Sequence, residues 1–448
     1  MKEPTVVMTI AGSDSGGGAG IQADLKTFAA LDVHGTCAIT SITSQNTLGV
    51  QAIHNLPIET IDSQIKAVTS DMNIAYTKTG MLSSSGIIRK VAEIIKINKI
   101  PIVVDPVMAA EAGGSLMQTE ALSTLQEELI PLSTVITPNI HEAETLCGIS
   151  IHDWQDAKQA AKHMVDYGAN AVIITGGHLD GSDLLFDGTD HSLIKGSLIK
   201  GGTHGAGCTY SAALSVFLAK GESLNKAAYN AKSFVTNAIM QSRPVGQGVG
   251  PVNSIKSTLQ DAYRYKALHD VTKAFAILGS SDDIHILIPE VGCNIVSALP
   301  YASGVDEVCA IQGRIVRLNA MAHSVGCPAF GASSHVARIV LAAMQYDSQL
   351  KSAINIKYSE KILQMILSMG FTTASFDRKH EPSGTGTMEW GTAHAIKTYI
   401  QLHNKIPEII YDRGAVGKEP MIRLLSNSAE DAANRAVKIA KALKKSSK

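Results

Sequence analysis

The chain has 448 residues, more than one hydrophobic core usually organises, so we expect two domains. Hydrophobic residues make up 45% and charged residues 18%, a globular balance that excludes long disordered tracts, and the net charge of −1 gives no field for nucleic acid or an anionic membrane. The first residues enter a β-like segment without the features of a signal peptide, and no apolar run reaches about 18 residues. Six scattered cysteines without a CxxC pair are typical of reduced thiols, so we expect a cytoplasmic protein.

In the first half, short β-branched runs alternate with longer segments of helical period. This alternation is typical of βαβ units, so we expect an α/β fold with a central, mostly parallel sheet flanked by helices. The expected strands are Thr5–Ile10, Gly35–Ile42, Tyr76–Thr79, Ile102–Val104, Thr134–Ile136 and Ala171–Ile174. The expected helices include Ile21–Leu31, Ile58–Ser70, Gly86–Ile97 and Asp153–Tyr167.

Two glycine-rich turns each precede a helix. The first, AGSDSGGGAGIQAD at Ala11–Asp24, would let backbone amides approach a ligand, but it lacks the lysine of a P-loop, and a tight βα turn explains it equally well. The second, GGTHGAGCTYSAAL at Gly201–Leu214, would direct the amides of Ala206, Gly207 and Cys208 at phosphoryl charge.

Cys208 stands at the start of the second of these helices. The positive end of a helix dipole lowers the pKa of a thiol, which would make Cys208 a proton acceptor. An isolated cysteine is more often a small buried hydrophobe, but the surrounding glycines favour the chemical interpretation.

Polar residues follow two expected strands between these turns. Asp105 lies in VVDPVM, and Asn139 and Glu142 lie at a helix start in TPNIHEAE. Carboxylates at strand ends beside phosphates commonly hold Mg²⁺, so we expect magnesium at Asp105 and Glu142. For Glu142 the alternative is an ordinary partner of the helix dipole.

Taken together, about residues 4–250 resemble the hydroxymethylpyrimidine and hydroxymethylpyrimidine phosphate kinases, which have a ribokinase-like fold. The matching segments, in this order, are AGSDSGGGAGIQADLKTF, SQNTLGV, KTGML, DPVM, TPNIHEAE, GGH and HGAGCTYSAA. The resemblance implies an ATP-dependent kinase in residues 1–250, with Cys208 as proton acceptor beside Gly205 and Gly207. Sugar kinases of this fold carry Asp at that position, so the cysteine indicates the pyrimidine branch.

The same resemblance implies where ligands bind. ATP phosphates would lie near Asn139 and Ala206, and Mg²⁺ near Asp105 and Glu142. Two departures remove cations from the ATP side: Glu111 stands where a lysine often follows DPVM, and Thr175 replaces the lysine of KGGH. The pyrimidine would contact Gly12, Ala19, Asp24, Gln45, Met81 and Val107, with Gln45 reading its edge.

A turn-rich stretch, RPVGQGVGPVN at Arg243–Asn253, marks the expected domain junction. A helix over Ser254–Leu278 should follow, and alternating strands and helices then predict a second α/β domain of three layers over residues 256–448. Its expected strands are Ile284–Ile288, Ala353–Ile356, Thr372–Phe376 and Ile409–Tyr411.

Three polar segments mark the second half: GRIVRLNAMAHSVGCPAFGASSHVAR, FDRKHEPSGTGTMEWG and YDRGAVGKEP. Their cations stand beside glycines and small hydroxyl residues, which suits phosphate groups, although each alone is more often a surface or ion-paired residue. His323, Cys327 and His335 lack the paired spacing of zinc ligands, so no metal is expected there. For His335, a capping or core histidine is the alternative.

These segments resemble the ThiN-type thiamine phosphate synthase domain, over about residues 256–445. The resemblance implies that hydroxymethylpyrimidine diphosphate, the product of the kinase, is joined to thiazole phosphate with release of pyrophosphate. Arg314 and His335 would be the catalytic pair, and Arg378, Arg413 and Lys418 would bind phosphate groups. Both families tend to self-associate, so we expect a homodimer.

Two alternatives stay open. The kinase domain could act on pyridoxal or a sugar. The second domain could bind thiamine phosphate and regulate, as the same domain does in transcriptional regulators, although the chain shows no evident helix-turn-helix.

Overall fold

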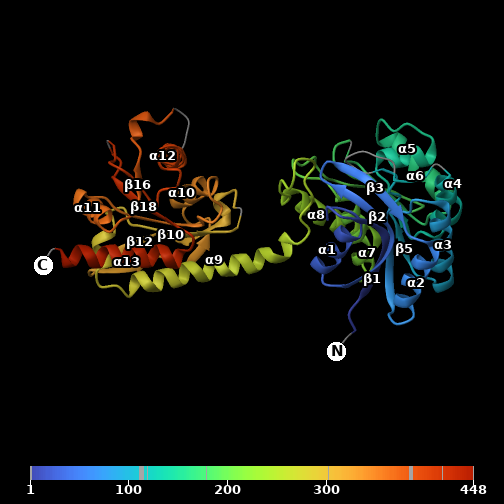
Figure 1. The fold of residues 1–448 in the computed structure, drawn as a ribbon, viewed down its shortest axis with the longest axis horizontal. Coiled ribbons are helices and arrows are strands. Elements are labelled where there is room, and N and C mark those ends of the chain that lie inside the picture. Colours follow the sequence, from blue (N-terminus) through green and yellow to red (C-terminus); the bar gives the residue numbers. More distant parts are fainter. Residues whose placement is uncertain are drawn as a thin grey trace. The chain divides into compact units, whose positions relative to one another are not determined.

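The computed structural model describes residues 3–109, 116–118, 120–177, 179–300, 302–382, 387–415 and 417–446 (Figure 1). Glu111 lies outside the described residues. The chain divides into two compact units, with the boundary between Leu259 and Gln260, inside helix α9 (Lys256–Gly279). None of the helices in the described ranges has the length and apolar character needed to cross a membrane.

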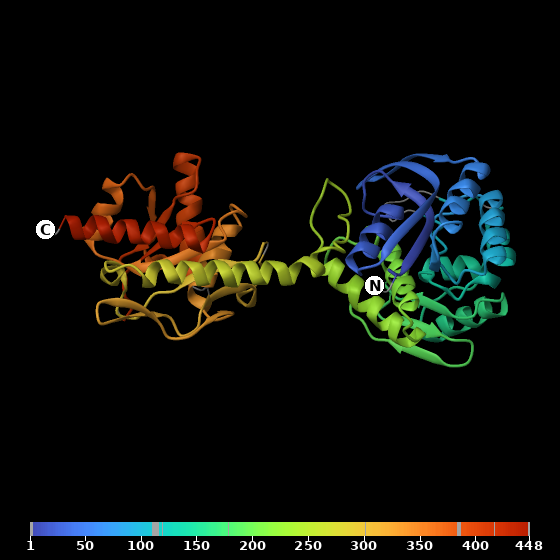
Figure 2. The same cartoon turned by 90° about the horizontal axis from the view of Figure 1, so that it is seen from below.

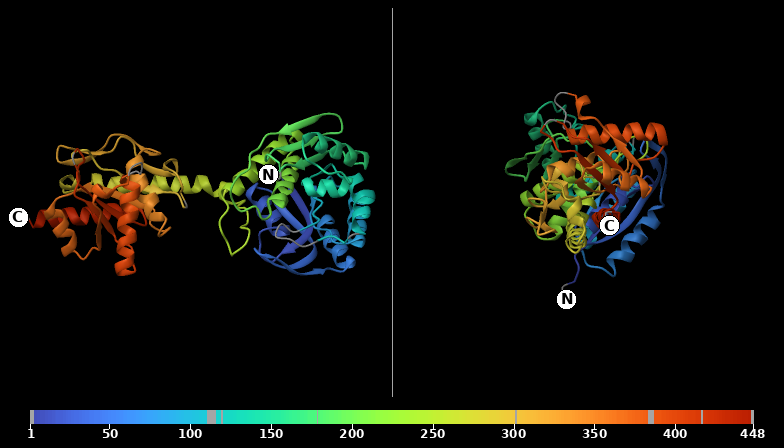
Figure 3. Two further views of the ribbon diagram at one scale, coloured as in Figure 1. Left: turned by 90° about the horizontal axis from the view of Figure 1, so that it is seen from above. Right: turned by 90° about the vertical axis from the view of Figure 1, so that its left-hand side faces the viewer.

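The first unit is built on a mixed sheet whose order, within the described residues, is β3-β2-β1-β4-β5-β6-β7-β8-β9. The strands from β2 to β7 are parallel, whereas β3, β8 and β9 pair antiparallel and form the two edges (Figure 3). The expected mostly parallel sheet is therefore confirmed. The strands are β1 (Val6–Asp14), β2 (His34–Asn46), β3 (Gly49–Asn55), β4 (Ile74–Thr79), β5 (Ile102–Val104), β6 (Val135–Ile136), β7 (Val172–Thr175), β8 (Asp183–Phe186) and β9 (His191–Ile194).

Helices cover both faces of this sheet (Figures 1 and 2). One face packs against α2 (Ile58–Thr69), α3 (Ser85–Asn98), α4 (Ala121–Thr124), α5 (Ile140–Cys147) and α6 (Trp154–Asp166). The other packs against α1 (Gly20–Ala30), α7 (Ala206–Ala219) and α8 (Leu224–Met240). Because the central strands are parallel, their carboxyl ends share one edge, which is where open α/β sheets bind ligands.

The second unit has a sheet of order β14-β11-β10-β15-β18-β17-β16 and a separate hairpin, β12–β13. Neighbouring strands are antiparallel except for β16 and β17, which are parallel. The strands are β10 (Ile295–Ala298), β11 (Val308–Ile311), β12 (Ile315–Leu318), β13 (Met321–Ser324), β14 (Pro328–Phe330), β15 (Ser352–Lys357), β16 (Thr373–Ser375), β17 (Ile409–Asp412) and β18 (Met421–Ser426).

Two hydrophobic cores lie on opposite faces of this second sheet, so the expected three-layer arrangement is confirmed. In β15, for example, Ile354 and Ile356 enter one core and Ala353 the other, because side chains alternate along a strand. The first core includes α9, α11 (Glu360–Ser368) and α13 (Ala429–Lys445). The second includes α10 (Ser334–Met344) and α12 (Thr387–His403).

The prediction of a strand at Ile284–Ile288 was wrong, because this segment begins with a 3-10 helix, η3 (Ile284–Leu287). Ile284 and Leu287 are buried against Leu278 of α9 in one core. A short apolar run has too few residues to show whether its period is that of a strand or of a helix, and tertiary packing decides.

Asp270 of α9 caps the start of α13 from outside that helix. Its Oδ2 accepts hydrogen bonds from the Ala429 amide and the Ser297 hydroxyl, both at 2.8 Å, and its Oδ1 accepts from the Glu430 amide at 3.1 Å. We expect Asp270→Ala to lower the free energy of unfolding of the second unit by about 1–2 kcal/mol, since capping carboxylates are worth about this much. Urea denaturation followed by circular dichroism would measure it, and an unchanged midpoint would contradict it.

Candidate functional site

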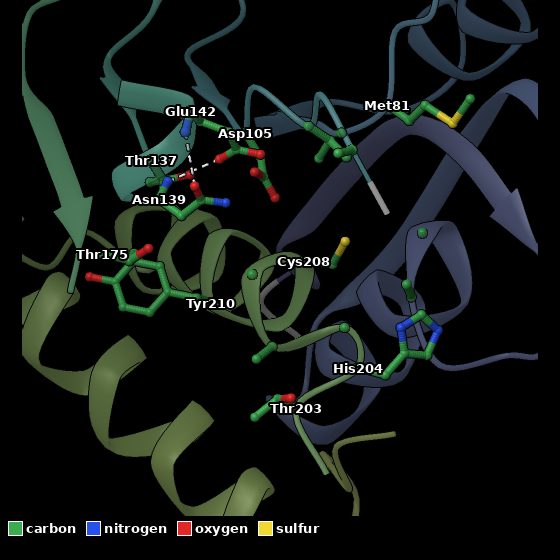
Figure 4. Close-up of a pocket in the computed structure, with 18 of the residues that line it drawn as sticks. Met81, Asp105, Thr137, Asn139, Glu142, Thr175, Thr203, His204, Cys208 and Tyr210 are labelled. Carbon is green, nitrogen blue, oxygen red and sulfur yellow. Dashed lines mark hydrogen bonds between the residues drawn. The ribbon is translucent and has the colours of Figure 1, made fainter. Parts of the chain in front are cut away.

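A cavity of about 710 Å³ lies at the carboxyl ends of the parallel strands (Figure 4). Its wall comes from the ends of β1 and β2, from the residues that follow β4, β5 and β6, and from the start of α7. Thr175, the lysine replacement, also lies in the wall. Of the residues that sequence analysis singled out in the first unit, the wall contains Gly12, Ala19, Gln45, Met81, Asp105, Val107, Asn139, Glu142, Gly205, Ala206, Gly207 and Cys208.

The first glycine-rich turn folds around Asp14 rather than leaving its amides free. Asp14 Oδ2 accepts from the amides of Gly18 and Ala19 at 2.9 and 2.8 Å, and Oδ1 accepts from Gly16 at 2.8 Å. Burial raises the pKa of Asp14, but the bonds from His204 and these amides outweigh burial, so the pKa is lowered overall. These three amides therefore shape the turn, as the βα-turn alternative predicts.

His204 joins the two glycine-rich turns. Its Nε2 lies 3.0 Å from Asp14 Oδ2 and 3.4 Å from Nε2 of Gln45, and its side chain is almost fully buried. A Cβ on Gly18 would come within 2.2 Å of the His204 ring, so only glycine leaves room for this contact. The predicted pyrimidine reader, Gln45, is thus held beside the turn that precedes α7.

The turn into α7 requires the glycine at position 205. Gly205 has a φ of +81°, and a Cβ there would stand 1.9 Å from the carbonyl oxygen of Gly18. The prediction for Ala206 was wrong in one respect: its amide donates to the Thr203 carbonyl at 2.8 Å, because the turn closes on itself. Gly207 and Cys208 follow in the first helical turn, where amides have no acceptor within the helix.

Cys208 points its sulfur into the cavity (Figure 4). The predicted low pKa is wrong for this structure, because burial raises the pKa of the thiol to about 12. Lys78 lowers the pKa, while Asp24 and Asp105 raise it further. The helix dipole is therefore outweighed by the loss of solvent around the sulfur.

Asp24 does not line the cavity, so the predicted contact with a pyrimidine was wrong. Its side chain has no exposed surface, and both oxygens lie 3.1 Å from Nζ of Lys78. The Thr9 hydroxyl donates to Oδ2 at 2.6 Å. A carboxylate in the α1 face that packs on the sheet must be paired to be buried, and Lys78 is its partner.

Asp105, Asn139 and Glu142 lie together in the cavity wall (Figure 4). Asn139 and Glu142 form a capping box at α5, with reciprocal bonds of 2.9 Å, so Glu142 also stabilises the start of that helix. Burial, and then the neighbouring Asp105, raise the pKa of Glu142 to about 8. Two carboxylates that repel each other at a cavity are suited to a divalent cation, although the described residues contain no group of three or more metal-ligating side chains.

His335 lies in the first turn of α10, and of the other predicted residues of the second unit Arg314 and Arg378 are near enough to lower its pKa. Arg314, at a φ of +102°, donates to the Val291 carbonyl oxygen. Arg378 is bound to Asp412 through Nε and Nη2, at 2.6 and 3.0 Å. Arg413 and Lys418 are exposed near the end of β17.

We expect His335 to stay neutral across physiological pH. Loss of solvent, and then the charges of Arg423, Arg378 and Arg314, lower its pKa to about 4. The unfolded chain binds a proton near pH 6.5 and the folded chain does not, so His335 should destabilise the fold as pH falls from about 6.5 towards 4. An NMR titration of the His335 ring, assigned with His335→Gln, would check this, and a midpoint near 6.5 would contradict it.

Several residues of these sites were missed by sequence reasoning. Lys78 had a signal, a charged residue inside an otherwise buried strand, and His204 lay within a quoted motif without a role. Asp14, Ser211 and Asp412 also lay within such motifs without a role, because their contacts join segments far apart in the chain. Arg423 had the same signal as Lys78, a charged residue inside an otherwise apolar strand.

Comparisons with known proteins agree with this architecture. A family model for phosphomethylpyrimidine kinase matches residues 14–253, and a model for thiamine-phosphate synthase ThiN matches residues 270–438. The first unit is similar to Bacillus subtilis pyridoxal kinase, solved as an ADP complex, with a TM-score of 0.53 and 40% identity over 56% of this chain and 98% of that one. The expected ribokinase-like fold is thereby confirmed.

Two relatives show the extent of the likeness. The hydroxymethylpyrimidine/phosphomethylpyrimidine kinase of Haemophilus influenzae is 50% identical over 256 residues, which are 55% of this chain and 95% of that one. The bifunctional thiamine biosynthesis protein ThiDN of Methanocaldococcus jannaschii is 33% identical over 435 residues, 95% of each chain. The chain therefore belongs to the bifunctional thiamine biosynthesis family in which a phosphomethylpyrimidine kinase is followed by a ThiN thiamine-phosphate synthase domain.

Proposed function

We propose that the first unit transfers the γ-phosphoryl group of ATP to hydroxymethylpyrimidine and then to its monophosphate. The observation that carries this proposal is that one cavity brings together the Cys208 thiol, the start of α7 and two buried carboxylates. Gly12, Ala19, Gln45, Met81 and Val107 would hold the pyrimidine. Cys208 would accept the proton of the alcohol, and the amides of Gly207 and Cys208 would stabilise the transferred phosphoryl group.

Asp105 and Glu142 fit a magnesium ion. Both are buried, and burial together with repulsion from Asp105 raises the pKa of Glu142, so a cation bound there would favour the ionised carboxylate. Mg²⁺ is usually bound by one or two carboxylates together with phosphates, and when bound it would neutralise phosphate charge. Asn139 would lie beside the ATP phosphates, and Thr175 stands in the wall where the resemblance implies a lysine.

We propose that the second unit joins the resulting diphosphate to thiazole phosphate, with Arg314 and His335 as its central residues. A neutral His335 among arginines leaves the positive charge of the site to the guanidinium groups, which suits a departing pyrophosphate. Arg413 and Lys418 are exposed and would contact phosphate groups. Arg378 is committed to Asp412 by two bonds, so its part would be more limited.

The test uses the purified full-length chain. With ATP and Mg²⁺ we expect phosphorylation of hydroxymethylpyrimidine and its monophosphate to exceed that of pyridoxal, which is included because the structural relative is a pyridoxal kinase. A clear preference for pyridoxal would overturn the substrate assignment. Supplied hydroxymethylpyrimidine diphosphate and thiazole phosphate should yield thiamine phosphate, and thiamine phosphate binding without turnover would show a regulatory domain instead.

A homodimer, a cytoplasmic location and the absence of a nucleic-acid partner remain predictions. Light scattering of the purified chain, cell fractionation and a gel-shift assay would check them in turn.

A further inference from the structure

A buried polar cluster lies between the sheet of the first unit and helices α1 and α7. We call it the Lys78 cluster, and its members are Thr9, Asp24, Lys78, Asp105 and Ser211. The side chains of Asp24 and Lys78 have no exposed surface, and that of Asp105 has 6%. The cluster adjoins the cavity at Asp105, which lies in its wall.

The strand register explains why a lysine is buried there. Thr9 of β1 is paired directly with Lys78 of β4, two residues after Val7 is paired with Tyr76. Val7 and Tyr76 pack with α1 and α7, and side chains two apart on a strand share a face. Lys78 therefore projects into a layer that is otherwise apolar.

The Lys78 ammonium contacts both Asp24 and Asp105, and Asp105 lies in the cavity wall. Nζ lies 3.1 Å from both oxygens of Asp24 and 3.8 Å from Oδ2 of Asp105. Ser211 Oγ lies 2.8 Å from that same Asp105 oxygen and 3.1 Å from the carbonyl oxygen of Cys208. The cluster is thus connected to the turn of α7 that carries Cys208.

Stability alone does not account for this ion pair. Removing two charges from water costs several kcal/mol per ion, and apolar residues of similar volume often replace a buried pair without loss. A buried charge beside a group that must ionise has a further use, because it favours the oppositely charged form of that group.

We propose that Lys78 is a positioning residue for phosphoryl transfer, whose ammonium group, held by Asp24, stabilises the thiolate of Cys208. This inference rests on the proposed kinase function. The O–H bond of the substrate alcohol breaks and its proton forms an S–H bond on Cys208. The alcohol oxygen forms a bond to the γ-phosphorus, and the bond to the bridging oxygen breaks with its electron pair leaving on ADP. Lys78 keeps its proton throughout.

The charges that face Cys208 act in opposite directions. Burial raises the pKa of the thiol most, Lys78 of β4 lowers it, and Asp24 of α1 and Asp105 after β5 raise it. The backbone amide of Gly20 lowers it as well. Removing the charge of Lys78 should therefore raise the pKa of the Cys208 thiol, and removing the charge of Asp24 should lower it. If the two residues had only a structural role, both substitutions would change the reactivity of Cys208 in the same direction.

The experiment measures alkylation of Cys208 by iodoacetamide, with EDTA present, as a function of pH in the full-length chain. The labelled peptide is quantified by mass spectrometry, and Cys208→Ala provides the blank. The variants are Lys78→Met, Lys78→Arg and Asp24→Asn. Lys66→Met and Asp71→Asn are matched controls at exposed positions of the same unit. Because no substrate is needed, the result is independent of the kinase assignment.

We expect Lys78→Met to slow alkylation at pH 8 about tenfold, which corresponds to a rise of about one unit in the pKa of the thiol. Asp24→Asn should speed alkylation, and Lys78→Arg should leave the profile near that of the unaltered chain. Kinase turnover should fall with Lys78→Met and recover towards high pH. The proposal would be overturned if the alkylation rate were unchanged in Lys78→Met, or if Lys78→Met and Asp24→Asn changed that rate in the same direction. If only one of these two variants folds, the direction in which its alkylation rate changes still tests the proposal.

If Cys208 of the unaltered chain is alkylated but the chain phosphorylates no pyrimidine, the kinase function is wrong. The effect of Lys78 on the thiol can still be measured in that case. The two failures are thereby distinguishable.

Discussion

Cys208→Ala should lower the rate of pyrimidine phosphorylation by about 10²–10⁴-fold, because a positioned proton acceptor contributes this much to a transfer reaction. Formation of thiamine phosphate from supplied hydroxymethylpyrimidine diphosphate should be unchanged, since Cys208 belongs to the first unit and Arg314 and His335 to the second. Both rates are measured on the same preparation, one with ATP and pyrimidine and the other with the diphosphate and thiazole phosphate.

The matched control for this substitution is Cys147→Ala. Cys147 is half-buried at the end of α5, outside the cavity, and its thiol donates to the Ala160 carbonyl oxygen at 3.4 Å. We expect it to keep the full kinase rate. Equal loss of both activities in Cys208→Ala would contradict the separation of the two sites, and equal loss of kinase activity in both variants would contradict the role of Cys208.

The second large effect concerns Asp412, at the end of β17. It is almost fully buried and binds Arg378 at 2.6 and 3.0 Å and Arg423 at 2.6 Å. Asp412→Asn would leave two buried guanidinium groups without a counter-charge, so we expect the free energy of unfolding of the second unit to fall by about 3–5 kcal/mol. Thiamine phosphate formation should be lost with it, whereas the kinase rate should be retained.

Asp283→Asn is the matched control, because it makes the same substitution in the same unit. Asp283 pairs with the half-exposed Lys444, and surface pairs contribute about 0–1 kcal/mol. Guanidinium denaturation of the full-length chain, with the two activities measured along the curve, would separate the variants. An equal, small change in both would show that the Asp412 pairs do not hold the second unit together.

How far the fold was predictable depends on the range of the interactions. The six strands expected in the first half all lie within the observed sheet, and the four helices expected there are present, because alternation and helical period are local properties. The antiparallel edges β3, β8 and β9 were not expected. Edge strands are short or partly exposed, so their pattern is weak.

For the candidate site, the sequence by itself determined which segments meet. Strand ends of a parallel sheet share one edge, so Gly12, Asp105 and Asn139 had to lie near each other, and twelve predicted positions do line one cavity. Only the tertiary structure decided the state of each group. It buried Asp24 against Lys78, closed the Ala206 amide onto Thr203, and raised the pKa of Cys208 where a helix end alone would lower it. Desolvation and ion pairing depend on atoms contributed by distant segments, and no local pattern of residues carries that information.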